Sequence, residues 1–351
     1  MSLQNASASC HPSADATPSE PTTSSAAESW QTALADLVTD PAELIALLGL
    51  NPAQKTVGLA AQQAFPLRVP RAFVERMQPG NWNDPLLRQV WPAQEETEQH
   101  PDLIADPLQE QSFNAAPGLL QKYAGRVLLM AAPHCAIHCR YCFRRHFDYD
   151  SNSPGRAEWQ PALDHICGDT SIHEVILSGG DPLANSDRQL RWLLQQLERI
   201  AHLSTLRIHT RLPVVIPERV TPSLCNLLQA SRFNIVMVIH SNHAQELDMS
   251  CATALQTLRQ AGATVLNQSV ILRGVNDEVA TLISLSERLF EAGVLPYYLH
   301  LPDAVDGTAH FQVSDQRAMQ LVQGMRGCLP GYLVPRLVRE IPGRDAKTIL
   351  A

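Results

Sequence analysis

The stretch Cys135-Ala-Ile-His-Cys139-Arg-Tyr-Cys142 decides how this chain is interpreted. It directly follows the apolar run Arg126–Ala131, which is typical of a strand. Three cysteines at spacings of four and three leave that strand on one loop, so their thiolates can converge on one point. In α/β folds, sites form at this end of the parallel strands. Three thiolates can bind three irons of a [4Fe–4S] cluster and leave the fourth iron open to a substrate or cofactor.

A zinc ion is the alternative occupant of this loop. The three cysteines would then be joined by a nearby histidine, either His134, His138 or His146. Zinc sites more often pair two separate Cys-x-x-Cys or Cys/His knuckles than use one short loop of this kind. The residues therefore favour the cluster and leave zinc open.

Downstream of the loop, short apolar runs alternate with amphipathic stretches. The predicted strands are Arg126–Ala131, Glu174–Leu177, Thr205–Ile208, Asn234–Ile239, Thr264–Leu272 and Pro296–Leu301. The predicted helices are Leu190–Ile200, Pro222–Ala230, Ala252–Gln260, Leu282–Ala292 and Arg317–Met325. This alternation predicts an α/β fold with a parallel sheet. Six such units fit a partial (β/α)6 barrel better than a complete eight-unit one.

The chain divides by composition into four parts. Residues 1–28 are rich in Ser, Ala, Thr and Pro and are predicted to be a disordered tail. Residues 29–121 are predicted to be a helical region that wraps the core, with a helix break at Asp40-Pro41. Residues 122–330 form the predicted barrel, and residues 331–351 a C-terminal segment.

Composition excludes several classes of protein. The 351 residues are 45% hydrophobic, with no apolar run long enough to span a membrane. A formal net charge of −8 argues against a protein that binds nucleic acid phosphates. The eight cysteines are too sparse for a disulfide scaffold, and no secretory signal is evident. These features predict a protein of a reducing cytoplasm.

Two loops together resemble the radical SAM superfamily, whose hallmark is a CxxxCxxC loop after the first strand of a partial barrel. The second loop, Ser178-Gly179-Gly180-Asp181-Pro182-Leu183, follows the second predicted strand. It is similar to the glycine motif that meets the amino-acid end of S-adenosylmethionine. The resemblance therefore implies that Gly179, Gly180 and Asp181 bind this cosubstrate, where glycines let the backbone approach a ligand.

Further stretches look like lysine 2,3-aminomutases. They include Cys142-Phe-Arg144-Arg145-His146, Thr210-Arg211-Leu-Pro-Val-Val, Leu272-Arg-Gly-Val-Asn276-Asp277 and Gly307-Thr-Ala-His310-Phe311. The entry stretch Trp30–Pro41 resembles the branch of that family which serves elongation factor P. The resemblance implies conversion of (S)-α-lysine to (R)-β-lysine. It also implies a one-electron reductant of the flavodoxin or ferredoxin type, an elongation factor P lysine ligase and elongation factor P as partners.

Other functions remain open at this stage. A catabolic or osmolyte-producing lysine or glutamate 2,3-aminomutase would share every cofactor motif. A non-catalytic iron–sulfur or zinc protein would need neither the glycine loop nor a reactive lysine.

The resemblance also assigns individual side chains. It implies that pyridoxal 5′-phosphate forms a Schiff base with Lys347, in Pro342-Gly343-Arg344-Asp345-Ala346-Lys347. Arg126 is then expected on the coenzyme phosphate, where a guanidinium can pair with two oxygens. Arg144 matches the arginine that binds the substrate carboxylate. Asp303 and Glu340 match two acidic residues around the substrate ε-ammonium, although the family residue at Glu340 is the shorter aspartate.

Overall fold

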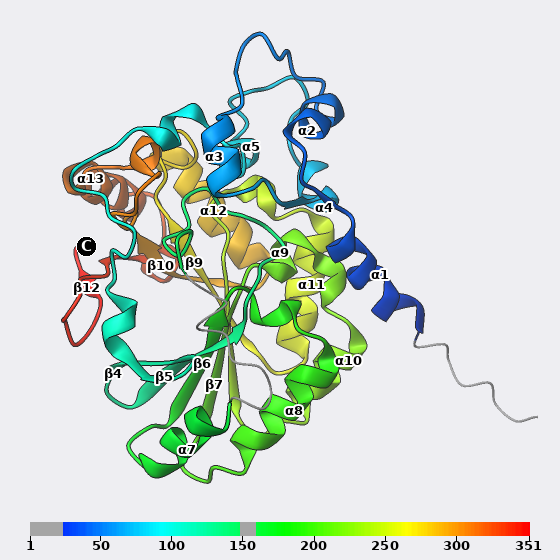
Figure 1. Ribbon diagram of the computed structural model, residues 1–351, viewed down its shortest axis with the longest axis vertical. Coiled ribbons are helices and arrows are strands. Elements are labelled where there is room, and N and C mark those ends of the chain that lie inside the picture. Colours follow the sequence, from blue (N-terminus) through cyan, green and yellow to red (C-terminus); the bar gives the residue numbers. More distant parts are fainter. Residues whose placement is uncertain (1–23, 148–158) are drawn as a thin grey trace, which may run out of the picture.

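A ten-stranded sheet forms the centre of the molecule (Figure 1). The computed structural model describes residues 24–147 and 159–351. Strands lie in the order β12-β11-β10-β9-β8-β7-β6-β5-β4-β3, and β5 to β11 run parallel. The parallel strands are β5 (Arg126–Ala132), β6 (Glu174–Gly179), β7 (Thr205–Thr210), β8 (Asn234–Ile239), β9 (Thr264–Val270), β10 (Leu295–His300) and β11 (Arg336–Arg339). In the described residues β3 and β12 do not pair with each other, so the barrel is open.

Helices connect successive parallel strands and cover the outside of the sheet (Figure 1). They are α7 (Gln160–Gly168), α8 (Asp187–Glu198), α10 (Pro222–Gln229), α11 (Met249–Gln260), α12 (Val279–Glu291) and α13 (Asp315–Arg326). Shorter helices in the loops are η3 (Pro182–Ala184), α9 (Leu212–Val215), η4 (Pro217–Arg219), η5 (Ala244–Glu246), η6 (Ala309–Phe311) and η7 (Gly331–Leu333). The prediction of an α/β fold with six strand–helix units in a partial barrel is confirmed.

Local sequence explains where these helices begin. Ser186 caps α8 in a capping box with Gln189, and Thr221 caps α10 ahead of a proline at its first turn. Asp248 and Ser314 accept backbone N–H bonds at the starts of α11 and α13. One face of each helix then packs its leucines on the sheet, as α8 does with Leu190, Leu193, Leu194 and Leu197.

The N-terminal region wraps one end of the sheet. It contains α1 (Ser24–Ala35), β1 (Leu37–Val38), α2 (Pro41–Leu47), α3 (Leu59–Ala64), β2 (Val69–Pro70), α4 (Arg71–Val74), α5 (Pro85–Arg88), η1 (Gln94–Thr97) and η2 (Glu110–Phe113). Its Trp30, Leu44 and Phe73 belong to the same buried cluster as Leu206 of the barrel, so both share one core. Of the predicted tail 1–28, residues 1–23 lie outside the described residues, whereas α1 already begins at Ser24.

The sheet extends beyond the predicted barrel at both ends. An antiparallel pair, β3 (Asn114–Ala116) and β4 (Leu119–Tyr123), joins the edge at β5. At the other edge, β11 adds a seventh parallel strand and β12 (Thr348–Ile349) pairs antiparallel with it. The boundaries predicted at 122 and 330 therefore divide one continuous sheet. These strands were missed because they are short, with three residues in β3, five in β4, four in β11 and two in β12.

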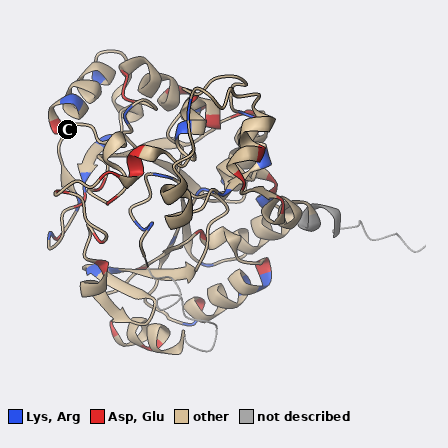
Figure 2. Cartoon of the chain, turned by 45° about the horizontal axis from the view of Figure 1, so that its top comes forward, with Lys and Arg blue, Asp and Glu red and all other residues tan. Residues whose placement is uncertain are grey.

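Charged residues of both signs are interspersed along the chain (Figure 2). Within the described ranges, no helix has both the length and the apolar character needed to cross a bilayer.

Candidate active site

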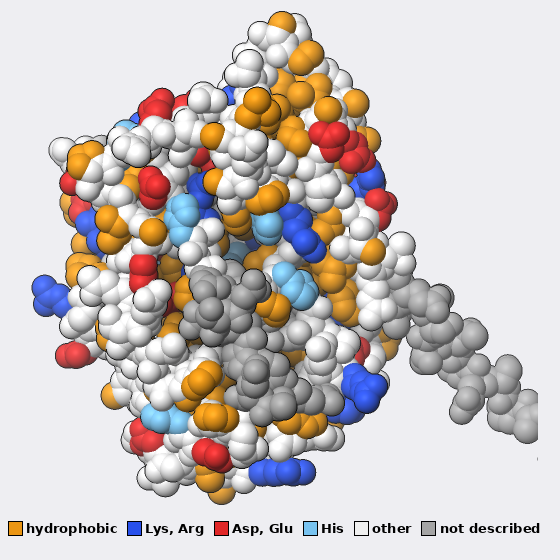
Figure 3. Space-filling model, in the orientation of Figure 1, with side chains coloured by type: hydrophobic (Ala, Val, Ile, Leu, Met, Phe, Trp, Pro, Cys, Tyr) orange, Lys and Arg blue, Asp and Glu red, His pale blue; other side chains and the backbone are white. Residues whose placement is uncertain are grey.

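One cavity of about 430 Å³ lies at the carboxyl ends of the parallel strands. Histidine and cationic side chains gather around the middle of this face of the molecule (Figure 3). Every site residue predicted from the sequence lines the cavity: Arg126, Cys135, Cys139, Cys142, Arg144, Gly179, Gly180, Asp181, Asp303, Glu340 and Lys347. The tertiary structure thus brings together side chains that are up to 221 positions apart, from Arg126 to Lys347.

The N-terminal wrap holds the cysteine loop from outside. Nε of Arg140 donates a hydrogen bond of 2.8 Å to Oε1 of Glu96. Nη2 of Arg145 donates one of 2.7 Å to Oε2 of the same Glu96 carboxylate. Both the Arg140 and Glu96 side chains are fully buried. His138 stacks on Phe65, with ring centroids 4.5 Å apart. The wrap therefore determines the path of the chain between the cysteines.

The glycine loop packs against the strand that leads into the cysteine loop. A Cβ on Gly180 would lie 2.3 Å from the carbonyl oxygen of His134, so only glycine fits there. The Gly180 amide donates 2.7 Å to the carbonyl of Ala132. Gly179 has φ of +112°, a conformation that also requires glycine. The close approach thus serves to join the two loops.

Asp181 fixes this loop to the end of β7. Its buried carboxylate accepts 2.6 Å from the Thr210 hydroxyl and 2.7 Å from the Arg211 amide. It also accepts from the amides of Leu183 and Leu212. With four donors on one carboxylate, Asp181 holds the glycine loop in place within the cavity wall.

The structure gives no support to the zinc alternative. Within residues 24–147 and 159–351, no group of three or more His, Cys, Asp and Glu side chains could hold a single metal ion. The Nδ1 atom of His138 contacts the carbonyl of Pro66 at 2.8 Å, and Nε2 of His146 contacts that of Asp306 at 3.2 Å. A [4Fe–4S] cluster does not require its ligands to meet at a single ion. Each cysteine binds a different iron, so the three sulfurs lie further apart than they would around one zinc ion.

A carboxylate on the opposite wall binds two ammonium groups. Glu340 accepts 2.5 Å from Nζ of Lys347 and 2.7 Å from Nζ of Lys122, and it accepts a further bond from the Tyr123 hydroxyl. Burial raises the pKa of Glu340, but Lys347 and the hydrogen bonds outweigh it and lower this pKa to about 2. Glu340 is therefore an anion that already binds primary ammonium groups.

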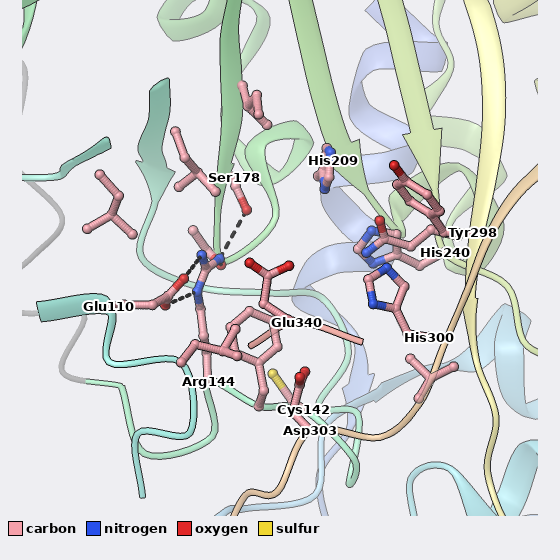
Figure 4. Close-up of a pocket in the computed structure, with 18 of the residues that line it drawn as sticks. Glu110, Cys142, Arg144, Ser178, His209, His240, Tyr298, His300, Asp303 and Glu340 are labelled. Carbon is pink, nitrogen blue, oxygen red and sulfur yellow. Dashed lines mark hydrogen bonds and ion pairs between the residues drawn. The ribbon is translucent and has the colours of Figure 1, made fainter. Parts of the chain in front are cut away.

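Asp303 lies at the same end of the cavity without such partners (Figure 4). No hydrogen bond to its carboxylate is formed by a described residue. Burial raises its pKa to about 6, and the neighbouring Glu340 adds to the rise while Lys347 opposes it. Asp303 is thus the carboxylate with unused binding capacity.

Arg144 reaches the cavity from the cysteine loop and pairs with Glu110 of η2. The guanidinium donates from Nε to Oε2 and from Nη2 to Oε1, each at 2.7 Å, and from Nη1 to the Ser178 hydroxyl at 3.0 Å (Figure 4). Only 7% of the Arg144 side chain is exposed. This bidentate pair shows that the subsite has the geometry to bind a carboxylate.

Among the described residues that line the cavity, Arg126 is the arginine without an ion-pair partner. It lies 4.7 Å from the ring centroid of Tyr123, and no described residue forms an ion pair with it. A guanidinium without a counter-ion in a cavity wall is suited to an incoming phosphate.

Three histidines line the side of the cavity between the cysteine loop and Lys347, and sequence reasoning missed them as a group. His209 lies on β7, His240 follows β8, and His300 ends β10 (Figure 4). The Nε2 atom of each is buried without a hydrogen-bond partner among the described residues. Burial, aided by Arg211, lowers the pKa of His240 to about 4, so its ring is neutral near pH 7. Their shared signal was their place at the carboxyl ends of predicted strands.

Comparisons with known proteins show the family to which this chain belongs. A family model described as "4Fe-4S single cluster domain" matches residues 124–209, which include both loops. L-lysine 2,3-aminomutase of Escherichia coli (strain K12) is 50% identical over 92% of this chain and 94% of its own length. The enzyme of the same name from Haemophilus influenzae is 48% identical over 92% and 96%. A radical SAM methyltransferase from Sphaerobacter thermophilus superimposes over 63% of this chain and 68% of its own, with a TM-score of 0.45 and 15% identity.

The open α/β barrel, the three-cysteine loop and the cluster-domain match define a radical SAM enzyme with a [4Fe–4S] cluster. Sequence identity of about 50% to two curated relatives, over 92% of the chain, also shows the family. The chain belongs to the L-lysine 2,3-aminomutase family and is an isomerase.

Proposed function

We propose that this protein converts L-lysine to (R)-β-lysine, with a cluster on Cys135, Cys139 and Cys142 and pyridoxal phosphate on Lys347. One observation carries the proposal. A single cavity contains the cysteine loop, Lys347, a guanidinium that binds a carboxylate and a carboxylate that binds ammonium groups. The last two features match the two ends of free lysine.

The residues that line the cavity fit pyridoxal phosphate and S-adenosylmethionine. Arg126 is suited to the coenzyme phosphate, and Tyr297 and Tyr298 provide aromatic surface in the same cavity. The glycine loop borders the cysteines, where S-adenosylmethionine would reach an open iron. When bound, these groups supply a radical and an imine that stabilises it, which is chemistry that protein side chains lack.

The chain's own residues orient the substrate. Arg144 would bind the α-carboxylate of lysine, while Asp303 and Glu340 would bind its ε-ammonium. Glutamate would place its side-chain carboxylate against these two acids, a like-charge contact that costs several kcal/mol. Lysine is therefore the preferred substrate.

The test uses two lysines that lie on the same carboxylate. The anaerobically reconstituted protein is loaded with pyridoxal phosphate, reduced with borohydride and mapped by peptide mass spectrometry. We expect the label on Lys347, its loss in Lys347→Ala and its retention in Lys122→Ala. The loaded wild-type enzyme should turn over lysine and leave glutamate unchanged. Label on Lys122, or protein without iron that binds zinc stoichiometrically, would contradict the proposal.

We further propose that β-lysine made in the cytoplasm is used by a ligase to modify elongation factor P. The resemblance of residues 30–41 to that branch supports this role. A flavodoxin- or ferredoxin-type protein would supply the electron. Mass spectrometry of elongation factor P from cells with and without this gene tests it. An unchanged mass would contradict the role and leave the aminomutase activity intact.

A further inference from the structure

Arg211 makes a contact with the cysteine loop that no cofactor assignment explains. It is the first residue after β7, and its Nη1 atom donates 2.7 Å to Sγ of Cys139. The same Nη1 donates 2.8 Å to the hydroxyl of Tyr141, which belongs to the cysteine loop. Only 5% of the Arg211 side chain is exposed. A permanent cation is thus held against one of the three thiol sulfurs.

The guanidinium cannot readily turn away from this sulfur. Its Nη2 atom donates 2.7 Å to Oε1 of Gln89 and 2.9 Å to Oε2 of Glu246. The ring of Phe73 covers it, with its centroid 5.3 Å from the guanidinium carbon. Gln89 and Phe73 belong to the N-terminal wrap, so three parts of the chain fix one side chain.

Glu246 accepts hydrogen bonds from several donors and leaves Nη1 of Arg211 to Cys139. Its Oε1 accepts from the amides of Asn242 and His243 and from Nε2 of Gln89. The carboxylate contacts Nη2 of Arg211, whereas Cys139 contacts Nη1. The positive charge therefore lies nearer to the sulfur than the negative charge does.

We propose that Arg211 sets the reduction potential of the cluster through its hydrogen bond to Cys139. This inference rests on the proposed assignment of the cluster to the three cysteines. Hydrogen bonds to the cysteine sulfurs and the local net charge are among the factors that set iron–sulfur potentials. A one-electron reductant adds one negative charge to the cluster, and a nearby cation stabilises that added charge. Arg211 thus raises the potential, and Glu246 lowers it by partly cancelling the cation. Arg211 is a positioning residue in this sense, because it acts through Cys139.

The experiment is a redox titration of the anaerobically reconstituted full-length protein, followed by the electron paramagnetic resonance signal of the reduced cluster. Arg211→Gln should lower the potential, with at least a tenfold change in the reduction equilibrium, or about 59 mV for one electron. Glu246→Gln should shift it in the opposite direction. Arg211→Lys keeps the charge and should fall between Arg211→Gln and wild type.

Arg219→Gln is the matched control. Arg219 is also a fully buried arginine, but it bonds to the carbonyls of Leu183 and Asn185 and to Asp187, and no hydrogen bond joins it to the cysteine loop. Its potential should equal that of wild type. If the Arg211→Gln protein loses its iron, the proposal is tested by Glu246→Gln alone. A higher reduction potential then supports the role of Arg211, and an unchanged or lower potential overturns it.

Iron content separates the two possible failures. Wild-type protein that binds no iron would overturn the proposed function as a whole. Iron-loaded variants whose potentials equal that of wild type, or which both shift in the same direction, would overturn the role of Arg211 and leave the cluster assignment standing.

Discussion

Two carboxylates of one cavity have opposite pKa shifts because their neighbours differ. Glu340 contacts two ammonium groups and its pKa falls to about 2, whereas burial raises the pKa of Asp303 to about 6. A raised pKa means that the folded state holds its proton more tightly than the unfolded state. Asp303 therefore lowers stability as the pH rises from about 4 through 6. Such a group destabilises the empty protein at neutral pH and is available to a cationic ligand.

Asp303→Asn should therefore separate stability from activity. At pH 8 the variant should melt at a higher temperature than wild type, and the difference should shrink toward pH 4, where the carboxyl is protonated in both states. The value of kcat/KM for lysine should fall roughly ten- to hundredfold, because a charge-assisted hydrogen bond to the ε-ammonium is lost. Thermal melts at both pH values and steady-state kinetics measure the two effects. A full kcat/KM would show that the ε-ammonium binds elsewhere.

Glu110 opposes the binding of a second carboxylate to Arg144. Two carboxylates around one buried guanidinium repel by roughly 2–3 kcal/mol at an effective dielectric of about 20. Glu110 also orients Arg144, which spares the substrate at most about 2 kcal/mol of side-chain entropy on binding. A glutamine at position 110 would keep part of this orientation. Repulsion is the larger effect, so Glu110→Gln should lower KM for lysine several-fold with little change in kcat. Steady-state kinetics at one pH suffice, and a higher KM would show that orientation dominates.

At the scale of elements, the loops after β5 and β6 meet at a point where only backbone fits. Gly180 makes this contact. It belongs to the glycine loop, which contains none of the three cysteines. The geometry therefore predicts that the glycine loop stabilises the cysteine loop.

Gly180→Ala should lose iron while the sheet remains folded. The added Cβ would meet the carbonyl oxygen of His134 at 2.3 Å, and rigid backbone must move to relieve this contact. Gly168→Ala is the control, because nothing lies within 4 Å of its Cβ and the site ends a helix. It should keep its iron and melt at the same or a slightly higher temperature. Iron analysis and circular dichroism decide, and a fully loaded Gly180→Ala protein would contradict the argument.

At the scale of the whole molecule, one of the contacts between the N-terminal wrap and the barrel is made by the buried carboxylate of Glu96. Glu96 contributes no group to the cavity, yet it binds Arg140 and Arg145 of the cysteine loop. The wrap is therefore coupled to the cluster site through this ion-pair network.

Glu96→Gln should reduce the free energy of unfolding by about 3–5 kcal/mol, because it leaves buried guanidinium groups without their counter-charge. Glu43→Gln breaks an ion pair with Arg71 whose partners are 37% and 39% exposed, and its effect should stay below about 1 kcal/mol. Denaturant titration compares the two. Equal effects would show that the Glu96 network does not stabilise the fold.

Much of this protein could be predicted from local sequence. The strand-and-helix alternation after Arg126 predicted the six units of the barrel, because hydrophobic periodicity reflects which face of each element is buried. The cysteine and glycine loops could be placed at one end of the sheet, since loops that follow parallel strands share an edge. The short strands β3, β4, β11 and β12 were missed because two to five residues are too few to show a hydrophobic period.

The sequence by itself determined the fold class, the family and the residue types of the site, because spacing and periodicity are local properties. Only the tertiary structure decided which charges lie together. The pairs Arg144–Glu110, Lys347–Glu340 and Arg211–Cys139 join residues that are 34, 7 and 72 positions apart in the sequence. The pKa shifts of Glu340 and Asp303, and the choice of Asp303 as the carboxylate without a partner, depend on distances and burial that arise only when the wrap, the barrel and the C-terminal strands pack together.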